Sequence, residues 1–209
     1  MPLYLGSEKI KSKDYGLWVG GSKIKLAYFG STLVYQYIPY TPSQNLVNLT
    51  GEAGPYTITL YPGSYNVEVS GGGSTGSYWY NGRFSGGTSG GGGGTVKGTF
   101  VVLKTCTATY FACTYSGTSY LQINGNDCLI ARSSNGTTGG TSSKTAVANY
   151  TNVDGMTTYT GGNGSSGLWG QNPGVGYSDH GWATGAPGNG FGNASTTGAH
   201  GGVWITYNG

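Results

Sequence analysis

The chain has 209 residues, of which 43 are glycine and only 8% are charged, and its net charge is +3. Ordinary proteins hold about 7% glycine and 25% charged residues, so roughly 28 glycines are in excess, and the composition of a charge-rich disordered tail is excluded. The positive charge arises within residues 1–40 from five lysines against two acids. This excess is too small for a nucleic-acid-binding face and indicates a solvated strand face instead.

Residues 1–40 contain a weak repeat in which a short apolar or aromatic run ends in Gly-Ser, at 3–7, 17–22 and 27–31. This pattern predicts strands followed by tight turns, and alternation with period two over 22–28 supports it. Forty residues of hairpins cannot form a sufficient core, so we expect an attachment module that packs on the rest of the chain or on another subunit. A proline-spaced linker is expected at 41–54, and a second domain at 55–209.

No secretory leader is expected, because the first 25 residues hold no apolar run of about 7–15 residues. No stretch is long and apolar enough to span a membrane. We therefore expect synthesis in a cytoplasm without export by a conventional leader.

Strand signals recur through the second domain. Two strands are predicted around Pro62-Gly63, at 56–61 and 64–69, and a third at 95–102. A hairpin is expected where Asn124-Gly125 joins 120–123 to 128–131, and 202–207 forms a last strand. No segment shows an apolar period of 3.6 residues, so the fold class is all-β.

Glycines between these strands recur every third residue, at positions 161, 164, 167 and 170, at 185 and 188, and at 198 and 201. Three residues per turn is the repeat of the polyproline II helix, which has no internal hydrogen bonds. Collagen needs an unbroken repeat and abundant proline, whereas this repeat slips and only seven prolines occur. We expect a β-sandwich-like framework with short polyglycine II helices, bonded laterally and preceded by a small β-hairpin module.

The three cysteines are odd in number, lack a C-x-x-C pair and lie in strand-like sequence. This pattern predicts neither a disulfide framework nor a zinc site, and we expect mostly reduced thiols in the core. A Cys106–Cys113 bridge is the alternative that the sequence leaves open.

Several matches to catalytic motifs are expected by chance at this glycine content. Residues 71–76 match G-x-G-x-x-G, but no helix former follows and no acid lies about 20 residues further on. Ser74 and Ser89 lie in G-x-S-x-G, also near the chance rate. We expect no cofactor, no metal and no catalytic residue. A hydrolase that uses Asp179, paired with His180, is a minor alternative.

Aromatic residues beside polar ones punctuate the glycine-rich loops. Rings held on rigid loops give contact area at low entropy cost and suit recognition of sugars and protein epitopes. The alternative is that the rings cap and pack the helix ends. The candidate receptor-binding residues are Tyr78, Trp79, Tyr80, Arg83, Trp169, Tyr177, Asp179, His180, Trp182 and Phe191.

The segments 62–73, 92–100, 129–131 and 201–207, together with the glycine tracts, resemble the glycine-rich domain of bacteriophage tail-fibre and adhesin proteins. That domain is also known in secreted bacterial proteins and in the ectodomain of the anaplastic lymphoma kinase receptor. The resemblance covers roughly 55–209 and implies a β-framework with a polyglycine II bundle whose loops bind a partner. Residues 131–136 depart from it, replacing the long glycine run common after that strand. The N-terminal repeats resemble the start of phage tail and prophage proteins of gut bacteria.

The resemblance implies a non-enzymatic structural protein of a phage or prophage particle. We expect a tail-fibre or tail-tip adhesin in the virion that contacts other virion subunits through residues 1–40 and binds a host-surface glycan or protein. A homo-oligomer is expected, with no nucleic-acid or membrane partner. The alternative is a self-assembling filament or capsid-decorating subunit.

Overall fold

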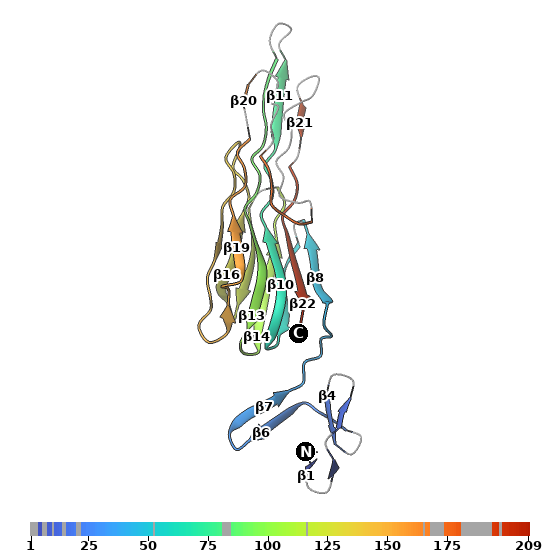
Figure 1. Ribbon diagram of the computed structural model, residues 1–209. Coiled ribbons are helices and arrows are strands. Elements are labelled where there is room, and N and C mark those ends of the chain that lie inside the picture. Colours follow the sequence, from blue (N-terminus) through green and yellow to red (C-terminus); the bar gives the residue numbers. More distant parts are fainter. Residues whose placement is uncertain are drawn as a thin grey trace. The chain divides into compact units, whose positions relative to one another are not determined.

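The computed structural model describes residues 4–5, 8–9, 11–13, 16–19, 22–51, 53–80, 85–115, 117–164, 166–167, 174–180, 194–196 and 198–209. The chain forms two compact units, residues 1–42 and 43–209. Strands and loops make up the described residues, which confirms the all-β fold class, and none of these residues lies in a helix that could cross a membrane (Figure 1).

The first unit consists of local antiparallel pairings, as its repeat predicts. Strand β1 pairs with β2, β3–β5 form a three-stranded sheet, and β6 pairs with β7. The strands are β1 (Tyr4–Leu5), β2 (Glu8–Lys9), β3 (Lys11–Lys13), β4 (Gly16–Val19), β5 (Ser22–Ile24), β6 (Leu26–Phe29) and β7 (Thr32–Gln36). Lys23 lies over the ring of Tyr37, with its Nζ 3.7 Å from the ring centroid. On the β6–β7 hairpin, Phe29 is 82% exposed and Val34 is 61% exposed.

A six-stranded antiparallel sheet forms one layer of the second unit. Its order is β18-β13-β10-β22-β8, and β19 also pairs with β13. These strands are β8 (Gln44–Thr50), β10 (Gly63–Ser70), β13 (Thr95–Val102), β18 (Thr151–Asn152), β19 (Met156–Tyr159) and β22 (Gly202–Tyr207). Strand β8, at one edge, occupies residues that we expected in a linker. The division between the units therefore falls before residue 43 instead of near residue 55.

A five-stranded sheet of order β17-β16-β15-β14-β9 forms the facing layer. Its strands are β9 (Ala53–Leu60), β14 (Cys106–Ala112), β15 (Thr118–Ile123), β16 (Asn126–Arg132) and β17 (Ser142–Lys144). The expected hairpin at Asn124-Gly125 is confirmed, and both residues have the positive φ, 49° and 79°, that a two-residue turn of this type requires. The strands around Pro62-Gly63 also form, but β9 and β10 belong to different sheets, so this connection crosses between the layers.

The core lies between these two sheets. Strands β10, β13 and β22 contact β14, β15 and β16 across the layers. Alternate residues of β10 point into the core, where Tyr65 and Val69 are fully buried, and Leu121 and Leu129 are buried from the other sheet. This alternation of inward apolar and outward polar residues is typical of a sandwich.

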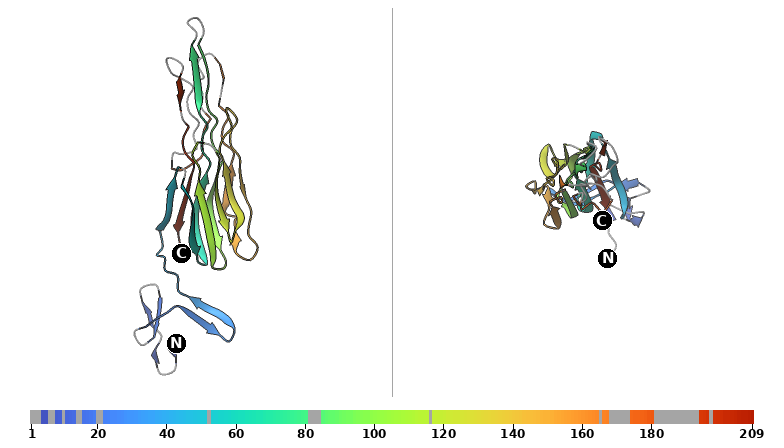
Figure 2. Two further views of the ribbon diagram at one scale, coloured as in Figure 1. Left: turned by 180° about the vertical axis from the view of Figure 1, so that it is seen from behind. Right: turned by 90° about the horizontal axis from the view of Figure 1, so that it is seen from above.

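Beyond the sandwich, a four-stranded sheet has the order β20-β12-β11-β21. Its strands are β11 (Gly76–Tyr80), β12 (Ser85–Thr88), β20 (Ser166–Gly167) and β21 (Ala194–Thr196). Four glycine-rich tracts join its strands to β10, β13, β19 and β22 of the six-stranded sheet. The order β19-β13-β10-β22 therefore continues as β20-β12-β11-β21 (Figures 1 and 2). Each segment therefore keeps the same neighbouring segments in both sheets.

The tract 90–94 has a threefold repeat. A Cβ built at Gly90 or Gly93 would overlap backbone atoms of Ser74 or Gly71, in the tract 71–74. A Cβ at Gly91 or Gly94 would instead meet Thr138 or Thr141, and one at Gly92 would meet Val175. The neighbour recurs every third residue, whereas in a β-strand it would recur every second residue. The expected polyglycine II geometry is thereby confirmed for this tract.

Backbone hydrogen bonds from this tract run outward in several directions. The amide of Gly92 donates to the carbonyl of Gly162 at 2.9 Å, and that of Gly94 donates to Arg132 at 3.0 Å. The carbonyls of Gly90 and Gly94 accept from Gly174 and Gly71, at 2.8 and 2.9 Å. A flat strand bonds to neighbours on two sides only, so bonds to four separate segments require a bundle of coils. We call these laterally bonded tracts (71–74, 89–94, 132–141, 160–164, 174–175 and 198–201) the glycine lattice.

The predicted period-three pairs take part in this lattice where the structure describes them. A Cβ at either Gly161 or Gly164 would meet the tract 89–93, and one at Gly198 or Gly201 would meet residues 70–74. Gly167 lies in β20, where it pairs with Gly87. Gly170, Gly185 and Gly188 lie outside the described residues.

All three cysteines are buried free thiols. Cys106 begins β14, and Cys113 directly follows its last residue, Ala112. A strand rises about 3.3 Å per residue, which places the two cysteines roughly 23 Å apart, too far for a disulfide. The alternative of a Cys106–Cys113 bridge is therefore wrong.

Candidate functional site

The candidate site is a hollow of about 430 Å³ over the outer face of the six-stranded sheet. It is lined by Asn66, Val67, Glu68, Lys97, Gly98, Thr157, Tyr159, Asp179, His180, Trp204 and Thr206. Sites for small ligands commonly measure about 300–1,000 Å³. Two of the predicted site residues, Asp179 and His180, thus share one hollow.

A row of side chains in register across five strands runs beneath the hollow, and four of its five members line the hollow. Glu68 of β10 pairs with Trp204 of β22 on one side and Lys97 of β13 on the other. The row continues from Trp204 to Asn48 and from Lys97 to Thr157. Residues opposite one another in a sheet share a face, so these five side chains lie together. We call this set the cross-strand row.

One end of the cross-strand row is fixed by a hydrogen bond. The indole Nε1 of Trp204 donates to Oδ1 of Asn48 at 2.9 Å, and Trp204 is only 6% exposed. A buried indole N–H requires such a partner, and the bond sets the plane of the ring.

Segment 177–180 covers the row and is held by Glu68. The carboxylate of Glu68, 5% exposed, accepts hydrogen bonds from Ser70 Oγ at 3.0 Å, from the amide of Asp179 at 3.2 Å and from Ser178 Oγ. A buried carboxylate is tolerated when donors of this kind surround it. Glu68 therefore anchors the segment on the sheet.

Lys97 forms a second anchor. Its Nζ donates to the carbonyl of Tyr177 at 2.8 Å and forms an ion pair with Asp179. The same amine lies 5.4 Å from the ring centroid of Tyr159. The cationic group of the hollow is thus already engaged by the chain's own groups.

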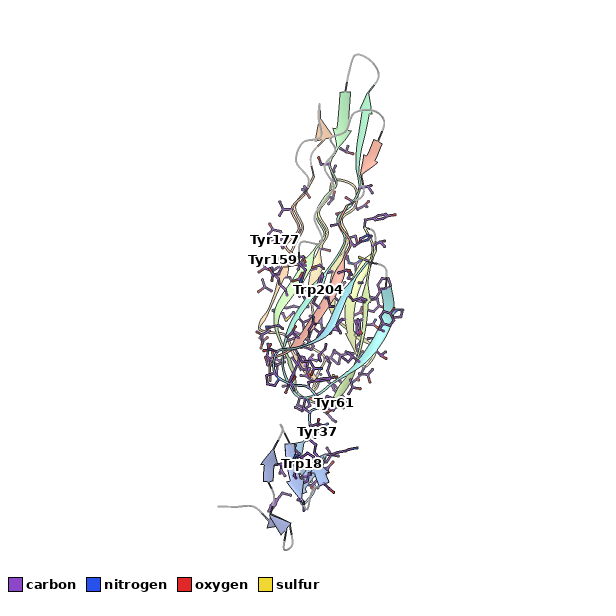
Figure 3. The ribbon with its side chains drawn as sticks, turned by 90° about the vertical axis from the view of Figure 1, so that its right-hand side faces the viewer. Trp18, Tyr37, Tyr61, Tyr159, Tyr177 and Trp204 are labelled. Atoms are coloured by element: carbon purple, nitrogen blue, oxygen red, sulfur yellow. The ribbon has the colours of Figure 1, made fainter. Side chains whose placement is uncertain are left out.

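Two stacked ring pairs flank these charges. His180 stacks on Trp204 with centroids 4.2 Å apart and planes at 13°, and Tyr177 stacks on Tyr159 at 5.3 Å and 20°. Figure 3 places Tyr177 beside Tyr159, where the coiled tracts meet the strands. The outer rings remain partly accessible: Tyr177 is 43% exposed, and the side chain of His180 is 45% exposed.

The chemistry of this arrangement favours binding over proton transfer. Both carboxylates of the hollow are engaged, Glu68 by three donors and Asp179 by Lys97. The Nε2 of His180 lies 4.0 Å from Glu68, and its ring is stacked on Trp204. Among the described residues, no group of three or more His, Cys, Asp and Glu is placed to hold a metal ion.

Three of the other predicted site residues, Tyr78, Trp79 and Tyr80, lie away from the hollow. The backbone of Tyr78, Trp79 and Tyr80 belongs to β11 in the four-stranded sheet, across the lattice from the hollow (Figure 1). Arg83, Trp169, Trp182 and Phe191 lie outside the described residues. The structure therefore brings together Tyr177, Asp179 and His180 and separates Tyr78, Trp79 and Tyr80 from them.

Sequence reasoning missed Glu68, Lys97, Tyr159 and Trp204. Glu68 carried a usable signal, since it is an acid on the polar side of an alternating strand, Tyr65-Asn66-Val67-Glu68-Val69. Its partners could not be identified from the sequence, because Lys97 and Trp204 adjoin it only through sheet register.

The chance matches to catalytic motifs also have a structural explanation. Ser74 Oγ donates to the carbonyl of Gly136 and accepts from the amide of Gly91 at 3.0 Å. Its hydroxyl thus holds lattice tracts together.

Comparison of the chain with protein-family models, with curated proteins and with solved structures finds no match. The sites described above therefore rest on the geometry of this chain alone.

Proposed function

We propose that this chain is a non-enzymatic structural protein of a phage or prophage particle, and that it acts as a tail-fibre or tail-tip adhesin. One observation carries the proposal: the order β19-β13-β10-β22 continues through the glycine lattice as β20-β12-β11-β21. The five residues between β10 and β11 span about 15 Å as a threefold coil. The lattice thus holds a second sheet at a fixed distance from the sandwich, as suits a domain that presents binding loops.

The proposed attachment module is the first unit. Its β6–β7 hairpin exposes Leu26, Tyr28, Phe29 and Val34, at 48%, 58%, 82% and 61%. Neighbouring exposed apolar side chains of this kind mark interaction surfaces. Docking of this hairpin on another virion subunit would cover them, and a homo-oligomeric fibre is the proposed assembly.

The location in a particle is tested by immunogold electron microscopy of particles released by a bacterium that encodes the chain. Antibodies raised against residues 43–209 are expected to label the tail or its tip. Labelling confined to cell debris, with the chain absent from purified particles by mass spectrometry, contradicts the proposal.

Receptor binding is tested with fluorescently labelled full-length protein on a panel of gut bacteria. The protein is expected to remain on the cells of its host, and the triple variant Trp169→Ala/Tyr177→Ala/Trp182→Ala is expected to lose this binding. The matched control replaces two exposed tyrosines of the other sheet and its loops, Tyr56→Ala/Tyr115→Ala, and retains it. Equal binding by the triple variant and the wild type contradicts the assignment of these rings.

The exposed β6–β7 hairpin also favours a second function, a self-assembling filament or decorating subunit. In that case Phe29 and Val34 bury against another copy of this chain. Sedimentation velocity over a concentration series separates the two functions. Growing polymers that disappear in Phe29→Ser support the filament, whereas monomers or closed oligomers at all concentrations support the adhesin.

A further inference from the structure

We infer that the hollow over the cross-strand row binds a neutral saccharide unit. This inference rests on the proposed function, because it names the class of surface ligand that an adhesin would recognise there. His180 lines the hollow with a partly exposed ring, and Asp179, Lys97, Asn66 and Thr206 supply polar groups. Tyr177 adds a second partly exposed ring next to the hollow, because it stacks on the lining residue Tyr159.

The mixture of groups fits a ligand rich in hydroxyls. A hydroxyl both donates and accepts hydrogen bonds. The hollow offers an acceptor in the exposed carboxylate of Asp179, and groups that both donate and accept in Asn66 and Thr206. A sugar ring also presents C–H groups, which pack on the electron-rich face of an aromatic ring. Tyr177, 43% exposed, provides such a surface beside the polar groups.

The position of the hollow argues against an extended peptide. Peptides that add to a sheet bind at its edge, where backbone groups are unpaired. The hollow instead lies mainly over β10, β13 and β22, each of which is paired on both sides, and only Thr157 and Tyr159 of its lining belong to β19, which among the described strands pairs with β13 alone. Recognition in the hollow therefore falls to side chains.

Charge selects among saccharides. Two carboxylates, Glu68 and Asp179, line the hollow with one amine, Lys97, and that amine is engaged by Asp179 and Tyr177. A uronic acid or sialic acid would bring a further negative charge to this set and would be repelled. A cationic ligand such as a choline ester placed on these rings would be repelled by the ammonium of Lys97, which lies over Tyr159 and donates to the carbonyl of Tyr177. A neutral sugar avoids both conflicts.

The hollow is also preorganised. Segment 177–180 is tied to the sheet by Glu68 and Lys97, and the chain before it is bonded into the lattice through Gly174 and Val175. Groups fixed before binding lose less entropy when the ligand arrives. Tight anchoring of so polar a surface segment is expected of a binding site.

The test measures binding of the full-length protein to immobilised oligosaccharides of three classes: neutral, acidic and choline-bearing. Retention on members of the neutral class is expected, with no binding to the other two. Tyr177→Ala is expected to weaken binding about tenfold, the effect of losing one ring contact. The matched control is Tyr56→Ala, which removes an exposed tyrosine whose ring is tilted against that of Tyr110 on the other sheet.

A second variant and a measurement on the wild type guard against a folding defect. Asp179→Asn changes a side chain that is 71% exposed and is also expected to weaken binding. In the wild type, the neutral sugar is expected to shift the NMR signal of the indole N–H of Trp204, which lies under His180.

The inference is overturned by binding to acidic or choline-bearing sugars alone, by an unchanged affinity in both variants, or by an unmoved indole signal. Cell binding without any saccharide binding overturns this inference and leaves the proposed adhesin intact. Failure of the protein to bind any cell contradicts the adhesin itself.

Discussion

At the residue scale, Glu68 organises the face of the sheet that carries the hollow. It combines 5% exposure with three hydrogen-bond donors from two segments more than 100 positions apart in the chain. The sequence shows its polar position in the strand. It could not show that Ser178 and Asp179 are donors, because they lie more than 100 residues from Glu68 in the chain and only the fold brings them to it.

Replacement of Glu68 tests this role. Glu68→Gln leaves one acceptor oxygen and turns an N–H₂ group toward donors, so the free energy of unfolding should fall by about 1–3 kcal/mol. Urea denaturation measures the change. The control Asp127→Asn alters an exposed carboxylate bonded to Gln122 and should stay within about 0.5 kcal/mol of the wild type. A Glu68→Gln variant as stable as the control would show that these hydrogen bonds are dispensable.

The buried thiols give the stability a pH dependence. Burial raises the pKa of Cys128 from 9.0 to about 11. The unfolded chain therefore releases this proton at lower pH than the folded chain does. The stabilisation from the protonated thiol is complete below about pH 9 and is lost as the pH rises toward 11.

Comparison with Cys128→Ala isolates this effect from tyrosine ionisation. The advantage of the wild type over the variant should shrink by about 1.4 kcal/mol per pH unit above pH 9. Urea denaturation at pH 8, 9 and 10.5 measures it. An advantage that stays constant over this range would mean that Cys128 is not shielded from solvent.

At the element scale, the sequence predicted threefold glycine coils, but it did not predict which segments pack against each coil. The spacing of Gly161 and Gly164, and of Gly198 and Gly201, predicted threefold coils that the structure confirms. The tract 89–94 has no such spacing, because every position from 90 to 94 is glycine. Glycine is required at each of these positions because other segments pack against the tract on all sides. Those segments can be identified only from the fold. Strand β8 was missed because prolines at 39 and 42 suggested a linker that would extend to residue 54.

Substitution at the lattice tests its packing. In Gly93→Ala the new Cβ would overlap the backbone of Gly71 and Gly72, so tracts must move apart, and we expect a loss of about 3 kcal/mol or more. The control Gly51→Ala has open space but a φ of +74°, and should lose about 1–2 kcal/mol. Thermal unfolding followed by circular dichroism compares them. A smaller loss in Gly93→Ala than in Gly51→Ala would contradict close packing of these tracts.

At the scale of the whole molecule, the chain divides into two units, and among the described residues only the second has the packed sheets needed to fold alone. The second unit has two packed sheets and a lattice, whereas the described part of the first has only short local pairings. Two- and three-stranded pairings of this length are marginal in water. The sequence indicated this from the length of the hairpin segment, which it ended at residue 40, but it assigned residues 41–54 to a linker, whereas the second unit begins at residue 43 with β8.

Deletion of residues 1–42 tests the division of the chain into two units. Residues 43–209 alone should keep the β-sheet circular dichroism spectrum and unfold in one cooperative transition, since the strands of the sandwich and the lattice all lie within them. The spectrum and a thermal melt measure this. A fragment that aggregates or melts without cooperativity would show that the first unit completes the core.

Amide hydrogen exchange, resolved by NMR at individual glycines, tests the central claim of a laterally bonded lattice most directly. The amides of Gly92, Gly94, Gly140 and Gly161 each donate to a neighbouring tract at 2.8–3.0 Å. We predict that they exchange as slowly as the amides of β10 and β13, because both open only when the unit unfolds. Exchange of these four amides at the rate of an unprotected peptide would contradict the lattice.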